Sequence, residues 1–239
     1  MTKRHPTQKS ADGSDLAERH ASVLLATDPK ELEAAYDRWA PNYDFDLATL
    51  SGGCVNQPGV VAAQVLIRHL PSFRGEEGGR KDLQVLDFGC GTGAAGAYLK
   101  EHGMLDTLKQ LDGCDLSRGM LDQATKRNCY RRLVKSDFGG CPCESAAYDV
   151  VHASGVFAPG QAPPQAFDEF LRVLKPGGHA VFTIRCGYYD SDEGAAHRRY
   201  LEDLVERQRW RVVAKTEEEY LPAEDVTAYV FLMKKIETN

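Results

Sequence analysis

The sequence predicts an α/β fold: a mostly parallel sheet with helices on both faces, an antiparallel final strand and an N-terminal helical extension. After residue 83, short apolar runs alternate with helix-like periodic segments, a pattern typical of parallel sheets. Glycines follow the first of these runs directly, as expected of a strand-to-helix turn that binds a ligand. The last two predicted strands have no helix between them, so we expect an antiparallel hairpin at one edge.

Composition limits both the domain count and the class of partner. The chain has 239 residues, of which 42% are hydrophobic, and this favours one α/β domain with an extension over two domains. Its net charge of -6 gives no support for a nucleic-acid surface, because phosphate binding depends on clustered Lys and Arg. No run approaches the length of a membrane span, and the first ten residues lack the apolar core of a signal peptide. We therefore expect a soluble, cytoplasmic monomer without membrane partners.

The cysteines predict neither a disulfide framework nor a metal site. Seven cysteines at irregular spacings, an odd number, favour reduced thiols. Cys141-Pro142-Cys143 is a C-x-C sequence without a second pair at metal-ligand spacing, so no structural zinc is expected.

Before residue 83 we expect a disordered tail over residues 1–15 and a helical leader over residues 16–82, packed on the sheet domain as a lid. The tail has too little apolar surface to offset the entropy of ordering. In the leader, Asp28 is positioned to cap a helix that starts at Pro29. The predicted helices cover residues 16–25, 29–40 and 60–70, followed by a charged, Gly-rich linker at 75–81.

Residues 83–239 are predicted to form the sheet domain. The expected strands cover residues 83–88, 108–114, 133–135, 148–153, 179–185, 211–216 and 227–233. The expected helices cover residues 94–100, 118–126, 165–174 and 194–208. Ser117 is a helix cap, and residues 175–178, Lys-Pro-Gly-Gly, form the tight return into the fifth strand.

The glycine loop alone is compatible with two cofactors. Residues 91–96 fit the G-x-G-x-x-G dinucleotide fingerprint, with Asp115 at a suitable distance downstream, so an NAD(P)-dependent oxidoreductase is one alternative. Asp87 favours a different ligand, because a carboxylate at that strand end would repel a pyrophosphate and attract a cationic amino group. In addition, no second mononucleotide-binding half is evident.

Four segments together resemble the class I S-adenosylmethionine-dependent methyltransferases, which implies a Rossmann-like sheet. Residues 85–93 resemble the first motif of that family; residues 113–117 with 119–121 resemble the second; residues 136–138 resemble the adenine-contacting turn; residues 171–178 resemble the helix and turn before the fifth strand. More narrowly, residues 36–44 with 46–50 are similar to the leader of the methyltransferase-like proteins of the Williams-Beuren syndrome chromosome region.

The resemblance implies S-adenosyl-L-methionine as cofactor, S-adenosyl-L-homocysteine as product, and a set of binding residues. The methionine end of the cofactor would contact Asp87, Gly89, Cys90, Gly91, Thr92 and Gly93, and the ribose would contact Asp115. The adenine would contact Leu116, Met120, Asp137 and Phe138, while Ser154 and Gly155 would form the floor of the site. A lid over the site would consist of Tyr36, Trp39 and Tyr43, with Phe45 beside them. Each also has a structural alternative: Asp115 and Asp137 as turn residues, Met120 as core, the aromatics as anchors of the leader.

The methyl acceptor is less clear from the sequence. Because the sulfonium already carries the activated methyl group, the protein mainly has to align a nucleophile and exclude water. We expect a small-molecule acceptor, with a protein side chain as second choice. His152 is the nearest candidate for a general base, and Arg185, Tyr188, Tyr189 and Tyr220 are candidates for the acceptor pocket. A cofactor-binding module without turnover is a further alternative, because no catalytic residue is diagnostic.

Overall fold

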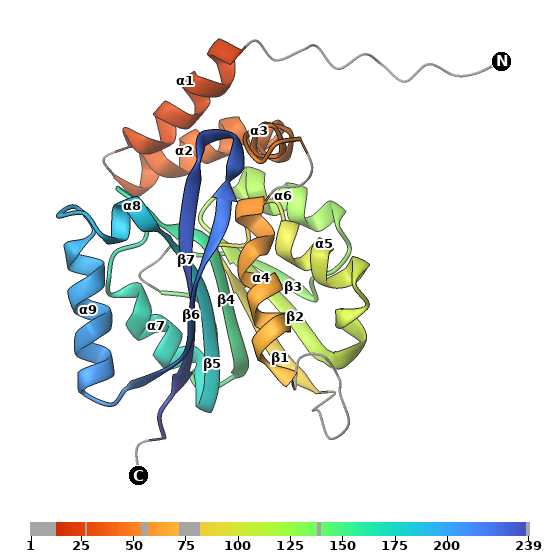
Figure 1. Ribbon diagram of the computed structural model, residues 1–239. Helices are drawn as coiled ribbons and strands as arrows, with labels where there is room; N and C mark the ends of the chain where they lie inside the picture. The colour runs from red at the N-terminus through yellow and green to blue at the C-terminus, as the bar shows by residue number, and fades with distance from the viewer. Residues whose placement is uncertain (1–12, 27, 54–56, 72–81, 138–139, 238–239) are drawn as a thin grey trace.

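A computed structural model describes residues 13–26, 28–53, 57–71, 82–137 and 140–237, and its centre is one seven-stranded sheet in the order β3-β2-β1-β4-β5-β7-β6 (Figure 1). The strands are β1 (Leu83–Phe88), β2 (Leu108–Asp115), β3 (Arg132–Lys135), β4 (Tyr148–Phe157), β5 (Leu174–Arg185), β6 (Trp210–Leu221) and β7 (Val226–Lys235). Strands β1 to β5 are parallel, whereas β7 runs antiparallel to both of its neighbours. The predicted sheet and its edge hairpin are therefore confirmed.

Helices cover both faces of this sheet (Figure 1). They are α1 (Gly13–Leu24), α2 (Pro29–Trp39), α3 (Tyr43–Leu50), α4 (Gln57–His69), α5 (Ala94–Glu101), α6 (Arg118–Lys126), α7 (Ala166–Val173), α8 (Cys186–Tyr189) and α9 (Ala195–Glu206), with short 3-10 turns at Met104–Thr107 and Pro222–Glu224. Successive side chains of β1 point to opposite faces: Val85 joins the apolar core under α4 and α5, and Leu86 joins the core under α7 and α9. Within the described residues, no helix is long and apolar enough to cross a bilayer.

Helix caps agree with the predicted sequence signals. The Asp28 carboxylate accepts hydrogen bonds from the backbone amides of Lys30 and Glu31, and the Ser117 hydroxyl accepts one from the amide of Met120. Helix α1 begins at Gly13, three residues before its predicted start, because Leu16 packs against the apolar cluster of the leader and holds the first turn. This shortens the predicted disordered tail, whose residues 1–12 lie outside the described residues, as does the predicted linker at 75–81.

Three strands are much longer than predicted, and tertiary packing explains each of these extensions. Strand β4 continues past Ala153 through an irregularity at Gly155, where φ is +76°, to the buried Phe157, whose ring packs against other core aromatics. Strand β5 includes the predicted return, because Leu174 already pairs with Tyr148. Strand β6 extends to residue 221 because β7 pairs with it along its whole length.

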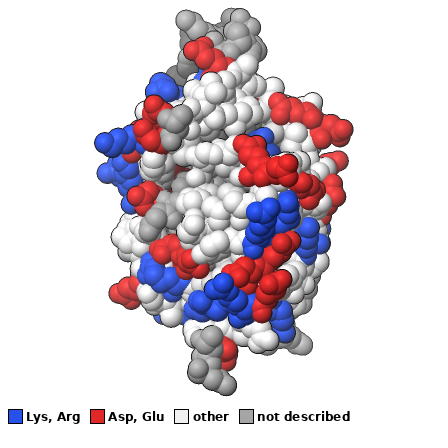
Figure 2. Space-filling view, turned by 90° about the vertical axis from the view of Figure 1, so that its left-hand side faces the viewer, with Lys and Arg blue, Asp and Glu red and all other residues white. Residues whose placement is uncertain are grey.

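Charge is mixed on the surface. The face shown in Figure 2 carries acidic and basic side chains close together, around an uncharged strip. A nucleic-acid surface would instead need clustered basic side chains.

Candidate functional site

Three adjoining cavities lie where the carboxyl ends of the parallel strands meet the leader helices α1 to α4. The glycine-loop cavity is lined by Tyr43, Pro58, Gly59, Asp87, Gly89, Cys90, Gly91, Thr92, Ala94, Ala95, His152, Ser154 and Gly155. The α6 cavity is lined by Leu32, Tyr36, Tyr43, Gly89, Gly91, Asp115, Leu116, Met120, Ser154, Gly155, Val156 and Gln161. The leader cavity is lined by residues of α1 to α4, β4, β5 and β6, among them His20, Trp39, Arg185 and Tyr220. Tyr43 and Gly155 line all three, so the cavities meet at these two residues.

Asp87 lies at the glycine-loop cavity, but both of its carboxylate oxygens already have protein partners. Tyr130 donates its hydroxyl to Oδ2 at 2.6 Å, and Nδ1 of His152 lies 2.8 Å from Oδ1. The other ring nitrogen of His152, Nε2, is buried and has no hydrogen-bond partner among the described residues. Each oxygen of Asp87 keeps a further lone pair, and Nε2 of His152, which Asp87 holds in place, is the buried polar atom here that has no partner in the described part of the chain.

The glycine loop owes its shape to left-handed backbone at Gly89 and Gly91. A Cβ at Gly89 would come within 2.2 Å of a Val156 methyl carbon. A Cβ at Gly91 would meet no atom within 4 Å and would instead occupy cavity space, so glycine there keeps the cavity open. Gly93, whose backbone is also left-handed, is the N-cap of α5; a Cβ there would press on Tyr130 and Ala124, and Gly93 does not line the cavities.

Asp115 holds the turn after β2 and can also accept hydrogen bonds from a ligand, which are the two roles considered for it. Oδ2 accepts a hydrogen bond from the amide of Gly91 at 2.8 Å, and Oδ1 accepts one from the amide of Ser117 at 2.9 Å. Each oxygen keeps a further lone pair, so the carboxylate can still accept from two ligand hydroxyls. Burial raises the pKa of Asp115 to about 6, against the lowering effect of the two amides. Leu116 and Met120 line the same cavity with buried side chains.

Cys90 and Thr92 both line the glycine-loop cavity. Burial raises the pKa of the Cys90 thiol well above its usual range, so the sulfur stays protonated and is no nucleophile. The Thr92 hydroxyl donates to Asp44 of the leader at 2.6 Å.

The leader aromatics do not act as one group. Tyr43 lines all three cavities and Tyr36 lines two, whereas Trp39 lines only the leader cavity. The Trp39 indole N–H donates to the buried Asp46 at 2.8 Å, which makes it part of the internal structure of the leader. Phe45 is 55% exposed and lines none of the three cavities.

Two leader carboxylates fasten the leader to the loops beneath it, and we call them the latch. Asp37 accepts from the Ser117 hydroxyl at 2.6 Å and from the Gly119 amide at 2.8 Å. Asp44 accepts from Thr92 and from Arg127, the latter at 2.5 Å. Sequence reasoning missed both residues, although each directly follows a tyrosine assigned to the lid.

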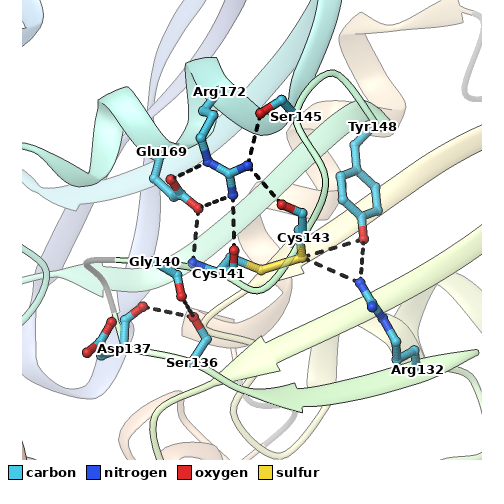
Figure 3. A network of polar contacts seen from close by, with 10 residues as sticks. All are labelled: Arg132, Ser136, Asp137, Gly140, Cys141, Cys143, Ser145, Tyr148, Glu169 and Arg172. Carbon is cyan, nitrogen blue, oxygen red and sulfur yellow. Dashed lines mark hydrogen bonds and ion pairs between the residues drawn. A yellow bond between two sulfur atoms is a disulfide. The ribbon is translucent and has the colours of Figure 1, made fainter.

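Asp137 does not face these cavities. Its side chain is exposed, and the Ser136 hydroxyl donates to its backbone carbonyl and to that of Gly140 (Figure 3). Phe138, predicted beside it at the adenine, lies outside the described residues.

The prediction of reduced thiols is wrong for Cys141 and Cys143, which form a disulfide in the loop beyond Asp137 (Figure 3). The Cys143 amide donates to the Cys141 carbonyl at 2.6 Å, and this tight turn brings the two side chains together. Arg172 donates to both cysteine carbonyls and to Glu169, which fixes the loop on α7. The other described cysteines are free.

The leader cavity contains two of the four residues predicted for an acceptor pocket. Arg185 and Tyr220 line it, but Tyr188 contacts His197 and Tyr189 packs on Tyr229 and Phe231. His152 lines the glycine-loop cavity and not this one, and its role as general base stays a prediction. His20 and Gln161 also line the leader cavity, and no local sequence signal marks them.

Comparison with known proteins finds relatives of this chain among methyltransferases. A methyltransferase domain family matches residues 86–182. Human Methyltransferase-like protein 27 is 34% identical over 204 residues, covering 83% of this chain and 77% of that protein. The malonyl-(acyl-carrier protein) O-methyltransferase of Enterobacter lignolyticus is 28% identical over 156 residues, covering 65% of this chain but only 54% of that protein.

Solved structures agree on the fold. A geranyl diphosphate methyltransferase in complex with GPP and sinefungin has a TM-score of 0.63 and 15% identity, and the likeness covers 87% of this chain and 99% of that one.

Proposed function

Because the chain belongs to the class I S-adenosylmethionine-dependent methyltransferase family, we propose that it transfers a methyl group from this cofactor to a small molecule bound in the leader cavity. One observation carries the proposal. The two cavities built from the glycine loop and α6 adjoin the leader cavity at Tyr43 and Gly155, so a donor and an acceptor can meet there.

The residues present fit the cofactor. Asp115 would accept hydrogen bonds from both ribose hydroxyls, while Leu116 and Met120 would flank the adenine. The unpartnered Nε2 of His152 suits the ammonium group of the methionine part, because a ring that donates from Nδ1 to Asp87 offers a lone pair at Nε2. We therefore assign His152 to cofactor binding, with Asp87 as the residue that orients it.

The protein's part in the reaction is alignment and exclusion of water. The cofactor supplies an electrophilic methyl group on a sulfonium. Tyr43 and Tyr36 form the wall between donor and acceptor, and burial raises the pKa of both phenols, so they remain neutral donors at pH 7. If the acceptor must lose a proton, His20 is the base within reach: burial first, and then Arg185, lower its pKa and keep the imidazole neutral.

Two measurements test the proposal. Calorimetric titration should show binding of S-adenosylmethionine and S-adenosylhomocysteine, and preferential binding of NADH would contradict it in favour of the oxidoreductase. Radiolabelled methyl transfer to extract fractions separated by molecular weight should label small molecules. Label in protein would point to the second-choice acceptor, and label in no fraction to a binding module without turnover. A cytoplasmic location and a monomeric state stay predictions from the sequence.

A further inference from the structure

Among the described residues that line it, the leader cavity has one fixed positive charge and no acidic side chain. Arg185 ends strand β5 and reaches the cavity beside Tyr220, with its Cζ 5.7 Å from the centre of the tyrosine ring. Most of the remaining wall is aliphatic or aromatic, contributed by residues such as Val23, Trp39 and Leu47. An arginine among apolar walls attracts an anion more strongly than one in bulk solvent, because such walls screen its charge less than water does.

Arg185 also has no counter-ion among the residues that the structure describes. In the part of the chain that the structure describes, its guanidinium takes part in no hydrogen bond and no ion pair, whereas Arg127 pairs with Asp44, Arg131 with Asp112 and Arg172 with Glu169. A guanidinium offers parallel N–H donors that match a planar carboxylate. The guanidinium of Arg185 is therefore available to pair with an anionic group of a ligand.

The groups around Arg185 favour an anion with a single charge. His20 adds no second positive charge at neutral pH, because burial and Arg185 lower its pKa. Burial raises the pKa of Tyr36 and of Tyr220, so both keep a hydroxyl proton that can be donated to an anion. The carboxylates of Asp87 and Asp115 line the adjoining cavities, where they would oppose a second negative charge.

We propose that the methyl acceptor is a small molecule with an apolar body and one carboxylate, and that Arg185 binds this carboxylate. The inference rests on the proposed function, since it names the substrate class of the same site. Arg185 is thereby the residue that sets acceptor specificity, while the apolar walls from the leader select for the body of the molecule.

Matched acids and amides test this inference. The full chain, saturated with S-adenosylhomocysteine, is titrated with 3-phenylpropionate and octanoate, with their primary amides, and with 3-phenylpropyl phosphate, using ligand-observed NMR. The acids should bind at least tenfold tighter than the amides and tighter than the phosphate. Arg185→Met should remove the preference for acids, and Arg185→Lys should retain part of it. Arg207→Met, at an exposed residue directly after α9, should leave the preference unchanged.

Four results would overturn the inference. Equal binding of acids and amides, tighter binding of the phosphate, no binding of the acids at millimolar concentration, or an unchanged preference in Arg185→Met would each do so. Titration of every variant with S-adenosylhomocysteine distinguishes the two levels of failure. Normal cofactor binding without a preference for acids refutes only the carboxylate acceptor, whereas no cofactor binding to the wild type refutes the proposed function itself.

Discussion

The proposed cofactor side and the proposed acceptor side of this site are built in different ways. The glycine-loop and α6 cavities draw most of their lining from strand ends and the turns that follow them, and their carboxylates are held by backbone amides and buried side chains. The leader cavity is assembled from helices and strands far apart in the sequence, with mostly apolar walls and one guanidinium. Charge and hydrogen bonds thus define the proposed donor side, and shape with a single charge defines the proposed acceptor side.

Loss of the Asp115 carboxylate should have the largest effect on the donor side. We expect Asp115→Ala to weaken S-adenosylhomocysteine about a hundredfold, because it removes two hydrogen bonds to a charged acceptor, each worth about 1.5 kcal/mol. Calorimetry measures the change, with Asp115→Asn as a variant of nearly the same shape and Asp122→Ala, exposed on α6, as control. Unchanged affinity in Asp115→Ala would leave Asp115 only its role in the turn.

Removal of the His152 imidazole should cost about tenfold, the value of one hydrogen bond between an ammonium group and an uncharged acceptor. A fragment sharpens this test: 5′-methylthioadenosine has the nucleoside but lacks the amino-acid end. His152→Leu should weaken S-adenosylhomocysteine and leave the fragment unaffected, whereas Asp115→Ala should weaken both. Equal losses for both ligands in His152→Leu would mean that the variant disturbs the whole pocket and would contradict the assignment.

The same contrast explains what sequence reasoning could and could not find. Strand ends and their turns are local, so the motifs correctly predicted the strand-to-turn junctions that carry Asp87, Gly89 and Asp115. Contacts between distant segments leave no local pattern, and the latch residue Asp37, which caps α6 from eighty residues away, was therefore missed. The disulfide was missed because a short C-x-C turn pairs two cysteines regardless of how many others the chain has.

Acid should weaken nucleoside binding through Asp115. Burial, with Asp87 and Asp37 adding to it, raises the pKa of this carboxyl to about 6, so protonation below that pH removes a lone pair that the ribose hydroxyls need. The carboxyl of Asp115 takes up this proton more readily in the free protein than in the complex. The affinity for the nucleoside is therefore constant above the pKa of Asp115 and falls as the pH drops through it. For 5′-methylthioadenosine we expect about fourfold weaker binding at pH 5.5 than at pH 7. Asp115→Asn should show no such dependence, and a wild-type affinity that does not change over this range would contradict the assignment.

The latch should have the smallest effect, and mainly on rates. Asp44 and Arg127 are each more than a third exposed, and partly exposed pairs contribute less than about 1 kcal/mol. We expect Asp44→Asn to speed dissociation of S-adenosylhomocysteine about threefold, because the leader then separates more easily from Thr92 and the glycine loop. Stopped-flow displacement measures this rate, with Asp203→Asn as control, since Asp203 forms a similar Asp–Arg pair on α9. A change in equilibrium affinity without a change in dissociation rate would show that Asp44 does not hold the leader closed over the cofactor.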